Sequence, residues 1–250
     1  PNEQEVKAVY AAIKEGGVIH VQARVNEYMG KLELSTDESM ELRVLKPSEY
    51  KAEQFIAVSK RDIEEMWREF DGHIKSIKDP TIRKILDDIF GDKAFVARFK
   101  HAPAAMHTHH AWLGGLMEHT LSIISVCDAA VKSYPELNRD LVVAGALLHD
   151  LGKLDEYEVS TVIKTTPVGM LIGHLSLQVG KIMEYRGKPG IDDNMLLKLA
   201  HMVISHHGKY EFGSPKIPAF PEALLFSTLD ALDAQMERML RIMHEANTES

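Results

Sequence analysis

The first fifth of the chain carries short helical and strand patterns. Apolar residues recur at helical spacing over residues 1–16, which predicts a short helix ended by Gly16-Gly17. The stretch "VIHVQARVNEY" alternates apolar and polar positions and predicts one half-buried strand, with its apolar face at Ile19, Val21, Ala23 and Val25. After a turn at Gly30-Lys31, two further strands are expected, through Leu32 and Leu34 and through Leu42 and Val44. So few strands do not make a stable domain alone.

From residue 59 onwards the apolar period becomes that of helices. We therefore divide the chain into a β segment at 1–50, a linker at 51–58 and a helical domain at 59–250. The sequence "SKRD", which begins at Ser59, is typical of a capping box and predicts a helix start there. Helices are expected over residues 59–77, 80–90, 92–100, 109–133, 138–150, 168–186, 193–207 and 221–247. The expected fold class is mainly α, a helical bundle with a small N-terminal β segment.

Composition narrows the functional classes. The chain has 250 residues, 45% of them hydrophobic, and a formal net charge of −8. The hydrophobic share is enough for a sizeable core, and the acidic balance argues against a protein that coats nucleic acid passively. Cys127 is the single cysteine, so an internal disulfide is excluded and a reducing cytoplasm is expected. The sequence has no run of about 18 apolar residues, so membrane association is not expected.

Histidines cluster in the helical half of the chain, which suggests that they share a purpose. Of the 13 histidines, ten lie between positions 101 and 207, namely His101, His107, His109, His110, His119, His149, His174, His201, His206 and His207.

Two predicted helices end on polar pairs. His149-Asp150 precedes Gly152, and His206-His207 precedes Gly208, and glycine is a common helix stop. The carboxyl end of a helix carries partial negative charge, which favours a cation nearby. Taken singly, an inward histidine is more often a hydrogen-bonded core residue, and a helical aspartate is more often a cap. Burying many such groups together without a cation would be costly.

The order of these residues resembles a known signature. His119, then His149-Asp150, then Asp230 is similar to the H…HD…D pattern of the HD superfamily of metal-dependent phosphohydrolases, and "HDLGK" at 149–153 is wording typical of that family. The further histidines His174 and His206-His207 resemble those of HD enzymes that hold two metals. The resemblance implies one ion held by His119, His149, Asp150 and Asp230, and a second held by His174, His206 and His207, with Asp150 bridging the two.

This implied donor set has a chemical consequence. Imidazoles with one bridging carboxylate suit Mn²⁺, Fe²⁺, Co²⁺ or Ni²⁺, with Mn²⁺ preferred here, whereas Mg²⁺ prefers oxygen ligands. Two such ions about 3.5–4 Å apart can share a hydroxide that attacks phosphorus in line. Asp150 would be the central bridge, and Lys153 would stabilise a phosphate oxygen. For Lys153, an interaction with the end of the helix is the alternative.

The whole chain resembles a narrower group. The strands "VIHVQARVNEYMGKLEL" are similar to the later strands of an OB-fold, which binds single-stranded nucleic acid. Together with "HHAWLGGLMEHT" and "SHHGKYEFGSPKIP", they resemble the YhaM-type 3′→5′ exoribonucleases, with upstream OB strands missing. We therefore expect a phosphodiesterase that shortens single-stranded RNA, or DNA, from its 3′ end.

Two alternatives stay open. An HD phosphohydrolase acting on a cyclic dinucleotide would continue past the paired histidines with Gly-Tyr-Pro, which "GKYEFGSPKIP" lacks, and one acting on a nucleotide often needs only the four-residue signature. A scaffold without catalysis would not need the seven expected ligands.

Weaker signals mark a surface for the substrate. His109 and His110 are expected to open the long helix, where they could receive a phosphate. Lys209 and Lys216 could make a basic rim for the strand. The sequence does not decide whether the protein forms an oligomer.

Overall fold

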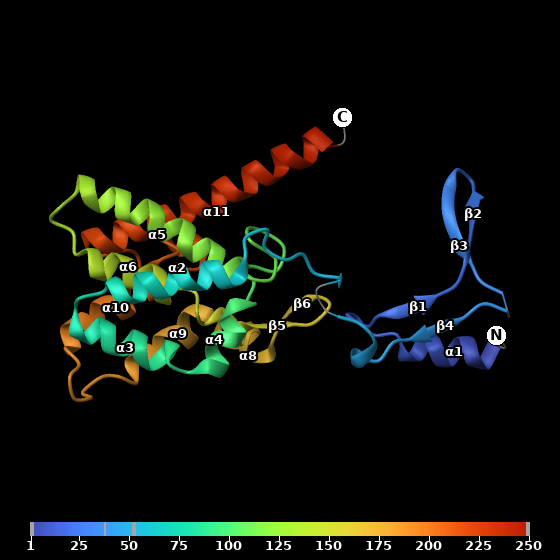
Figure 1. The fold of residues 1–250 in the computed structure, drawn as a ribbon, viewed down its shortest axis with the longest axis horizontal. Helices are drawn as coiled ribbons and strands as arrows, with labels where there is room; N and C mark the ends of the chain where they lie inside the picture. The colour runs from blue at the N-terminus through green and yellow to red at the C-terminus, as the bar shows by residue number, and fades with distance from the viewer. Residues whose placement is uncertain (1–2, 38, 52–53, 249–250) are drawn as a thin grey trace. The chain divides into compact units, whose positions relative to one another are not determined.

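A computed structural model describes residues 3–37, 39–51 and 54–248 (Figure 1). The chain divides into two compact units. The first comprises Pro1–Ile56 with Val159–Val162, and the second comprises Ala57–Glu158 with Ile163–Ser250. None of the helices within the described ranges is long and apolar enough to cross a membrane.

The N-terminal unit contains two separate antiparallel ribbons. Strand β1 pairs with β4, and β2 pairs with β3 through a turn at Met29-Gly30, where both residues have positive φ as a tight two-residue hairpin requires. The elements are α1 (Glu3–Ala12), β1 (Ile19–Val21), β2 (Arg24–Tyr28), β3 (Lys31–Ser35), β4 (Leu42–Val44) and the 3₁₀ helix η1 (Pro47–Glu49). The likeness to an OB-fold stays a prediction.

The prediction of one half-buried strand through Val25 was wrong. The extended stretch divides into β1 and β2, which belong to different ribbons. Every residue of β2 and β3 is exposed, and Val25 retains 64% of its accessible surface. Alternation produces burial only where a second layer packs on the apolar face, and a two-stranded hairpin has no such layer of its own.

The second unit is a helical bundle, which confirms the expected fold class. Most of its helices begin at an Asp, Asn or Thr whose side chain accepts a hydrogen bond from the first turn, at Asp62, Asp79, Asp92, Asn138, Thr166 and Asp192. The elements are α2 (Ile63–Ser76), α3 (Pro80–Phe90), α4 (Lys93–Lys100), α5 (Gly115–Ser133), α6 (Arg139–Leu148), α7 (Lys153–Glu156), β5 (Tyr157–Val159), β6 (Ile163–Thr165), α8 (Pro167–Ile172), α9 (His174–Met183), α10 (Asp193–Ser205), η3 (Tyr210–Phe212) and α11 (Pro221–Thr248).

Helix α6 lies at the centre of the bundle and packs against α5, α10 and α11. All of its residues from Leu141 to Leu148 are buried. Gly145 lies close to α10, because a Cβ at this position would meet the terminal methyl group of the Met202 side chain. The sequence is apolar on all sides because the helix is surrounded, and its carboxyl end delivers the pair His149-Asp150 to the interior.

Several helix boundaries differ from the prediction, and three of these differences affect the site. The cap of α2 is Asp62 rather than Ser59, because the Asp62 side chain accepts the Glu65 amide. Helix α5 begins at Gly115 rather than residue 109, after Gly114 with a φ of 81°. The helix expected over 168–186 breaks into α8 and α9 at Gly173, whose φ of 76° no continuous helix allows.

Only the first part of α11 packs as its apolar stripe predicts. Phe226 is fully buried and Leu229 packs on the core. Beyond them the carboxyl-terminal part of α11 extends away from the bundle (Figure 1), and Leu232, Met236 and Leu240 are about half exposed. The buried part of α11 includes the turn that positions Asp230.

Candidate metal centre

Seven side chains from five places in the bundle meet at the carboxyl end of α6. Asp150 Oδ2 lies 3.1 Å from His149 Nε2, and Asp150 Oδ1 lies 3.5 Å from both His174 Nε2 and His206 Nε2. Asp230 Oδ1 lies 3.1 Å from His119 Nε2. The cluster comprises His119 of α5, His149 and Asp150 after α6, His174 at the start of α9, His206 and His207 after α10, and Asp230 of α11. The structure therefore brings together all seven expected ligands.

Each imidazole of the cluster is held at its Nδ1 atom. The Nδ1 atoms of His149, His206 and His207 contact the backbone carbonyls of Ala146, Val203 and Phe212 at 2.7–3.0 Å. A carbonyl oxygen only accepts, so each of these Nδ1 atoms carries a proton and donates it. A ring that carries only this Nδ1 proton has its lone pair on Nε2, which is the form that binds a metal.

The Nε2 atoms of the cluster face carboxylate oxygens in a buried space. Within the described residues, the Nε2 atoms of His119, His149 and His174 and the Oδ1 atom of Asp150 are buried without a hydrogen-bond partner. His149 Nε2 lies 3.1 Å from Asp150 Oδ2, and with the His149 proton on Nδ1 one lone pair would face another. Such an arrangement is unfavourable unless a cation lies between the two atoms. The residues therefore fit a divalent metal ion, and the chain carries a divalent-metal-binding cluster.

Asp150 stands between two groups of histidines. Its Oδ2 atom faces His149 at 3.1 Å and His119 at 4.0 Å, whereas its Oδ1 atom faces His174 and His206. Burial disfavours the charged carboxylate, but the neighbouring His149 and Lys153 hold the pKa of Asp150 well below its usual range. Asp150 is thus an anion with one oxygen directed to each group.

Other pKa shifts favour neutral rings at the rim. Burial, together with the neighbouring histidines His206 and His174, lowers the pKa of His207 to about 4. His119 differs from it. Burial opposes protonation of His119, but the neighbouring carboxylates of Asp230 and Asp233 outweigh it and raise its pKa to about 9.

Residues 116–235 match the HD domain family. The chain is 32% identical over 246 residues to the 3′-5′ exoribonuclease YhaM of Geobacillus sp. (strain WCH70), covering 98% of this chain and 72% of that protein. It is 34% identical over 230 residues to the YhaM protein of Bacillus subtilis (strain 168), covering 90% and 71% of the two chains. The chain belongs to the YhaM family. No solved structure matches it.

In this YhaM-family chain, Gly152 has a different role from the one expected. Its φ is −61°, so it does not stop α6 through a left-handed conformation. A Cβ at Gly152 would lie 2.9 Å from His174 Cα and closer still to the His174 carbonyl oxygen. Glycine is required because the backbone of α9 passes directly over it, which brings His174 to Asp150. The other glycine of the prediction, Gly208, does have a positive φ, of 78°.

Lys153 lies beside Asp150 of the cluster. It begins α7, its side chain is 9% exposed, and its Nζ atom lies 2.6 Å from Asp150 Oδ2. Burial lowers the pKa of a lysine, but the Asp150 charge prevails and raises the pKa of Lys153 above its ordinary value. The side chain is therefore a fixed positive charge beside the cluster.

His109 and His110 do not open α5, because the chain turns twice before that helix begins. His110 has a φ of 48° and is buried, and its Nε2 atom lies 3.3 Å from Asp233 Oδ2. His109 is half-buried, with its ring centroid 5.2 Å from that of His119. Burial, with the charge of Lys153, lowers the pKa of His109 to about 3. A neutral His109 at the rim is available to a ligand, whereas His110 is not.

Two carboxylates of the site carried little signal in the sequence. Asp233 accepts a hydrogen bond from His119 Nδ1 at 2.7 Å, and Glu156 accepts one from His174 Nδ1 at 2.8 Å. The position of Asp233, three residues after Asp230, places both on one face of α11. Nothing in the sequence pointed to Glu156, because its role depends on the break at Gly173.

The two lysines expected at the rim lie at the surface. Lys209 and Lys216 are both exposed, and Lys209 Nζ lies 5.4 Å from the centroid of the Phe212 ring. Tyr210 and Phe212, in η3, retain 64% and 62% of their accessible surface. The backbone of this turn is joined to the metal centre, because Phe212 provides the carbonyl that holds His207.

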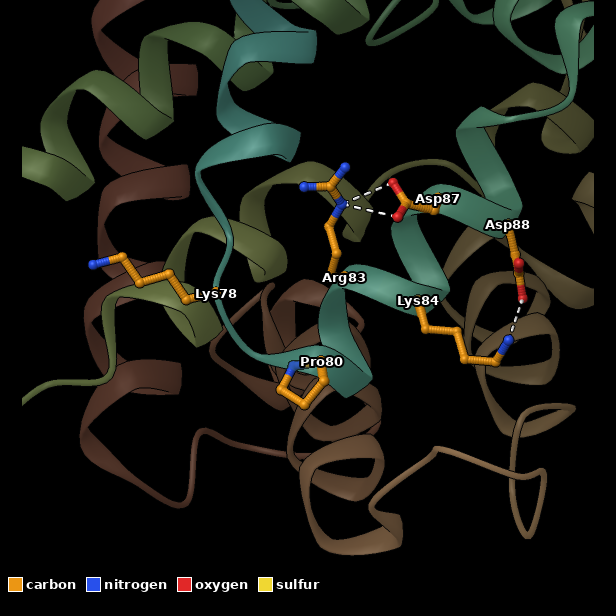
Figure 2. Close-up of a pocket in the computed structure, with 6 residues that line it drawn as sticks. All are labelled: Lys78, Pro80, Arg83, Lys84, Asp87 and Asp88. Atoms are coloured by element: carbon orange, nitrogen blue, oxygen red, sulfur yellow. Dashed lines mark hydrogen bonds and ion pairs between the residues drawn. The ribbon is translucent and has the colours of Figure 1, made fainter.

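A separate cavity lies on α3 and includes none of the cluster residues. Its volume is about 530 Å³, and Figure 2 shows its charged side chains. Arg83 binds both carboxylate oxygens of Asp87, and Lys84 lies 3.9 Å from Asp88. Four of the charged side chains are thus paired along α3, and Lys78, which precedes that helix, adds one positive charge to the lining.

Proposed function

We propose that this protein is a metal-dependent 3′→5′ exoribonuclease that removes nucleotides from single-stranded RNA. YhaM proteins described as 3′-5′ exoribonucleases are 30–34% identical to the chain over most of its length. The observation that carries the proposal is the placement of Asp150, with one carboxylate oxygen toward each of two histidine groups. A shared carboxylate of this kind is typical of a two-metal phosphodiesterase centre.

The centre would hold two divalent ions. His119, His149, Asp150 and Asp230 would bind one, and His174, His206, His207 and Asp150 the other. This nitrogen-rich donor set favours Mn²⁺ and also suits Fe²⁺, Co²⁺ or Ni²⁺. When bound, such ions lower the pKa of water and neutralise charge on a phosphoryl group.

The protein's own residues would orient the strand. Lys153 carries a buried positive charge suited to a non-bridging phosphate oxygen. His109, neutral and half-buried beside His119, offers a ring nitrogen to the same phosphate region. Lys209 and Lys216 would attract the backbone, and the exposed rings of Tyr210 and Phe212 would stack terminal bases. Stacking requires unpaired bases, which agrees with a single-stranded substrate.

The test compares substrates that differ in end and in kind. The metal-free protein is given Mn²⁺ and oligoribonucleotides labelled at the 3′ or the 5′ end, with the same sequence in DNA alongside. The 5′ label is expected to appear in a ladder of stepwise shorter products, and the 3′ label in mononucleotide from the start. Cleavage confined to cyclic dinucleotides or nucleoside triphosphates would contradict the proposal, as would no turnover with Mn²⁺, Fe²⁺, Co²⁺ or Ni²⁺.

Asp150→Ala provides the catalytic control. It is expected to abolish RNA shortening while the helical circular dichroism signal remains, because Asp150 contributes to the centre rather than to a helix interior. Normal turnover by this variant would refute the proposed centre. A cytoplasmic location and an oligomeric state both remain predictions.

A further inference from the structure

The five histidines of the centre are not all held in the same way. Three donate Nδ1–H to backbone carbonyls, but His119 and His174 donate to carboxylates. These two rings belong to different groups. His119 lies on the side of Asp150 Oδ2, at 4.0 Å, and His174 on the side of Asp150 Oδ1, at 3.5 Å. Each side of the centre thus has one carboxylate-supported histidine.

Asp233 is itself firmly positioned. Its Oδ2 atom accepts the His119 proton, and the Ser122 hydroxyl donates to its Oδ1 atom. His110 Nε2 lies 3.3 Å from Oδ2, and the His110 and Asp233 side chains are 8% and 13% exposed. His110 has a φ of 48°, which is uncommon for a residue other than glycine.

Glu156 is positioned by backbone packing. Its Oε2 atom accepts the His174 Nδ1 proton at 2.8 Å, and its Oε1 atom lies 3.4 Å from the His174 amide. The Glu156 backbone passes so close to Gly169 of α8 that a Cβ there would collide with it. The Glu156 side chain is 13% exposed, so solvent does not replace these bonds easily.

A carboxylate partner does more than fix the orientation of a ring. It fixes the proton on Nδ1, makes Nε2 a better electron donor, and commonly changes metal affinity by about 10–100-fold. A backbone carbonyl fixes the orientation without the added negative charge. The affinity for a metal ion on each side of Asp150 should therefore depend on the carboxylate that supports the histidine of that side.

We propose that Asp233 and Glu156 are positioning residues that tune the two metal positions separately. Asp233 acts through His119 on the ion at the Oδ2 side of Asp150, and Glu156 acts through His174 on the ion at the Oδ1 side. The proposal deepens the proposed function and rests on its two-ion centre. His110 and Ser122 contact Asp233, so they are expected to affect only the ion at the Oδ2 side of Asp150.

The experiment measures binding of Mn²⁺ to metal-free protein through the electron paramagnetic resonance signal of free Mn²⁺. Asp233→Asn and Glu156→Gln are each expected to weaken one of the two bound ions by about 10–100-fold and to leave the other unchanged. The double variant should weaken both. Asp128→Asn is the matched control, because Asp128 lies on α5 and pairs with Arg139 away from the centre. It should bind as the parent does.

Ligand variants assign each effect to its side. Asp233→Asn should add no further loss in a His119→Ala background but should act in full in a His174→Ala background, and Glu156→Gln should show the reverse. The proposal is overturned if either carboxylate variant weakens both ions equally, or if neither changes binding. Ser122→Ala keeps the charge of Asp233 and provides a milder test. It should weaken only the ion that depends on Asp233, and an effect on the other ion would also overturn the proposal.

Failure of the proposed function can be recognised separately. If the parent binds two ions and the variants behave as expected but RNA is not shortened, only the exoribonuclease proposal fails. If the parent binds a single ion, the two-sided assignment is wrong. At saturating Mn²⁺ both variants should recover most of the parent kcat on RNA, which a general loss of structure would not allow.

Discussion

Lys153 Nζ lies 2.6 Å from Asp150 Oδ2, and both side chains are buried. The lysine therefore neutralises the carboxylate at the oxygen that faces His149 and competes with any ion for it. A buried pair of this kind costs desolvation energy, so its presence in a metal-binding cluster suggests a role in the reaction rather than in stability.

Lys153→Met should reduce kcat on RNA by about 10²–10³-fold, because a fixed charge near the reacting phosphate is lost. Metal affinity should not fall, because Asp150 loses a competing cation. The measurements are single-turnover rates and bound metal at matched free Mn²⁺. Lys181→Met is the control, because Lys181 pairs with the partly exposed Asp155 and should retain parent activity. An activity loss that merely follows a loss of bound metal would contradict the prediction.

Gly152→Ala should damage the centre through the backbone. The new Cβ would meet the His174 carbonyl, so α9 must shift away from Asp150. Overpacking of this kind typically costs about 1–3 kcal/mol, which is read as a lower midpoint in urea unfolding. Gly180→Ala on α9 is the matched control. Nothing lies within 4 Å of its Cβ position, so this variant should gain about 0.5–1 kcal/mol. Equal effects of the two substitutions would refute the assigned close approach.

Tyr210→Ala and Phe212→Ala should raise the KM for single-stranded RNA. Base stacking on an aromatic ring contributes about 1–3 kcal/mol per base, or roughly 5–150-fold in affinity. Hydrolysis of the small diester bis(p-nitrophenyl) phosphate, which carries no base, should be unchanged. Tyr210→Phe keeps the ring and should behave as the parent. The prediction is wrong if both substrates lose activity in parallel, since that would indicate a disturbed His207 instead of lost stacking.

The helices were well predicted from the sequence because their apolar periodicity matches the core that they form. The apolar stretch Leu141–Leu148 predicted the position of α6, and the polar pair that follows it predicted the position of the metal-binding cluster. The predicted helix boundaries were wrong where the backbone angle of a single glycine interrupts the helix. Gly173 and Gly114 interrupt helical patterns that the periodicity alone would continue.

The seven clustered side chains were predicted from their order along the chain. The carboxylates that accept hydrogen bonds from two of the histidines were not. Glu156 meets His174 only because the chain reverses at Gly173, and a sequence pattern does not carry that geometry. The burial predicted for the strands of the β2–β3 hairpin was wrong for the opposite reason. Its alternation was present, yet burial depends on a covering layer that no strand can specify by itself.

Cys127 offers a probe of how the metal centre stabilises the bundle. It lies on α5 two turns beyond His119, is fully buried, and has its pKa raised to about 12, mainly by burial. As the single cysteine, it makes whole-protein mass a direct readout of alkylation. The folded protein at pH 8 should resist iodoacetamide, because the reactive thiolate is scarce and enclosed, whereas the denatured chain should take one group promptly.

Added Mn²⁺ should slow the alkylation of Cys127 further, because an ion that binds only the folded chain suppresses its opening. At a free concentration 100 times the dissociation constant, one ion lowers the open population about 100-fold, equivalent to about 2.7 kcal/mol. Asp150→Ala should alkylate at the same rate with and without Mn²⁺. If the parent also showed no dependence on the metal, the centre would not hold α5, α6 and α11 together, and the ligand assignment of His119 would be wrong.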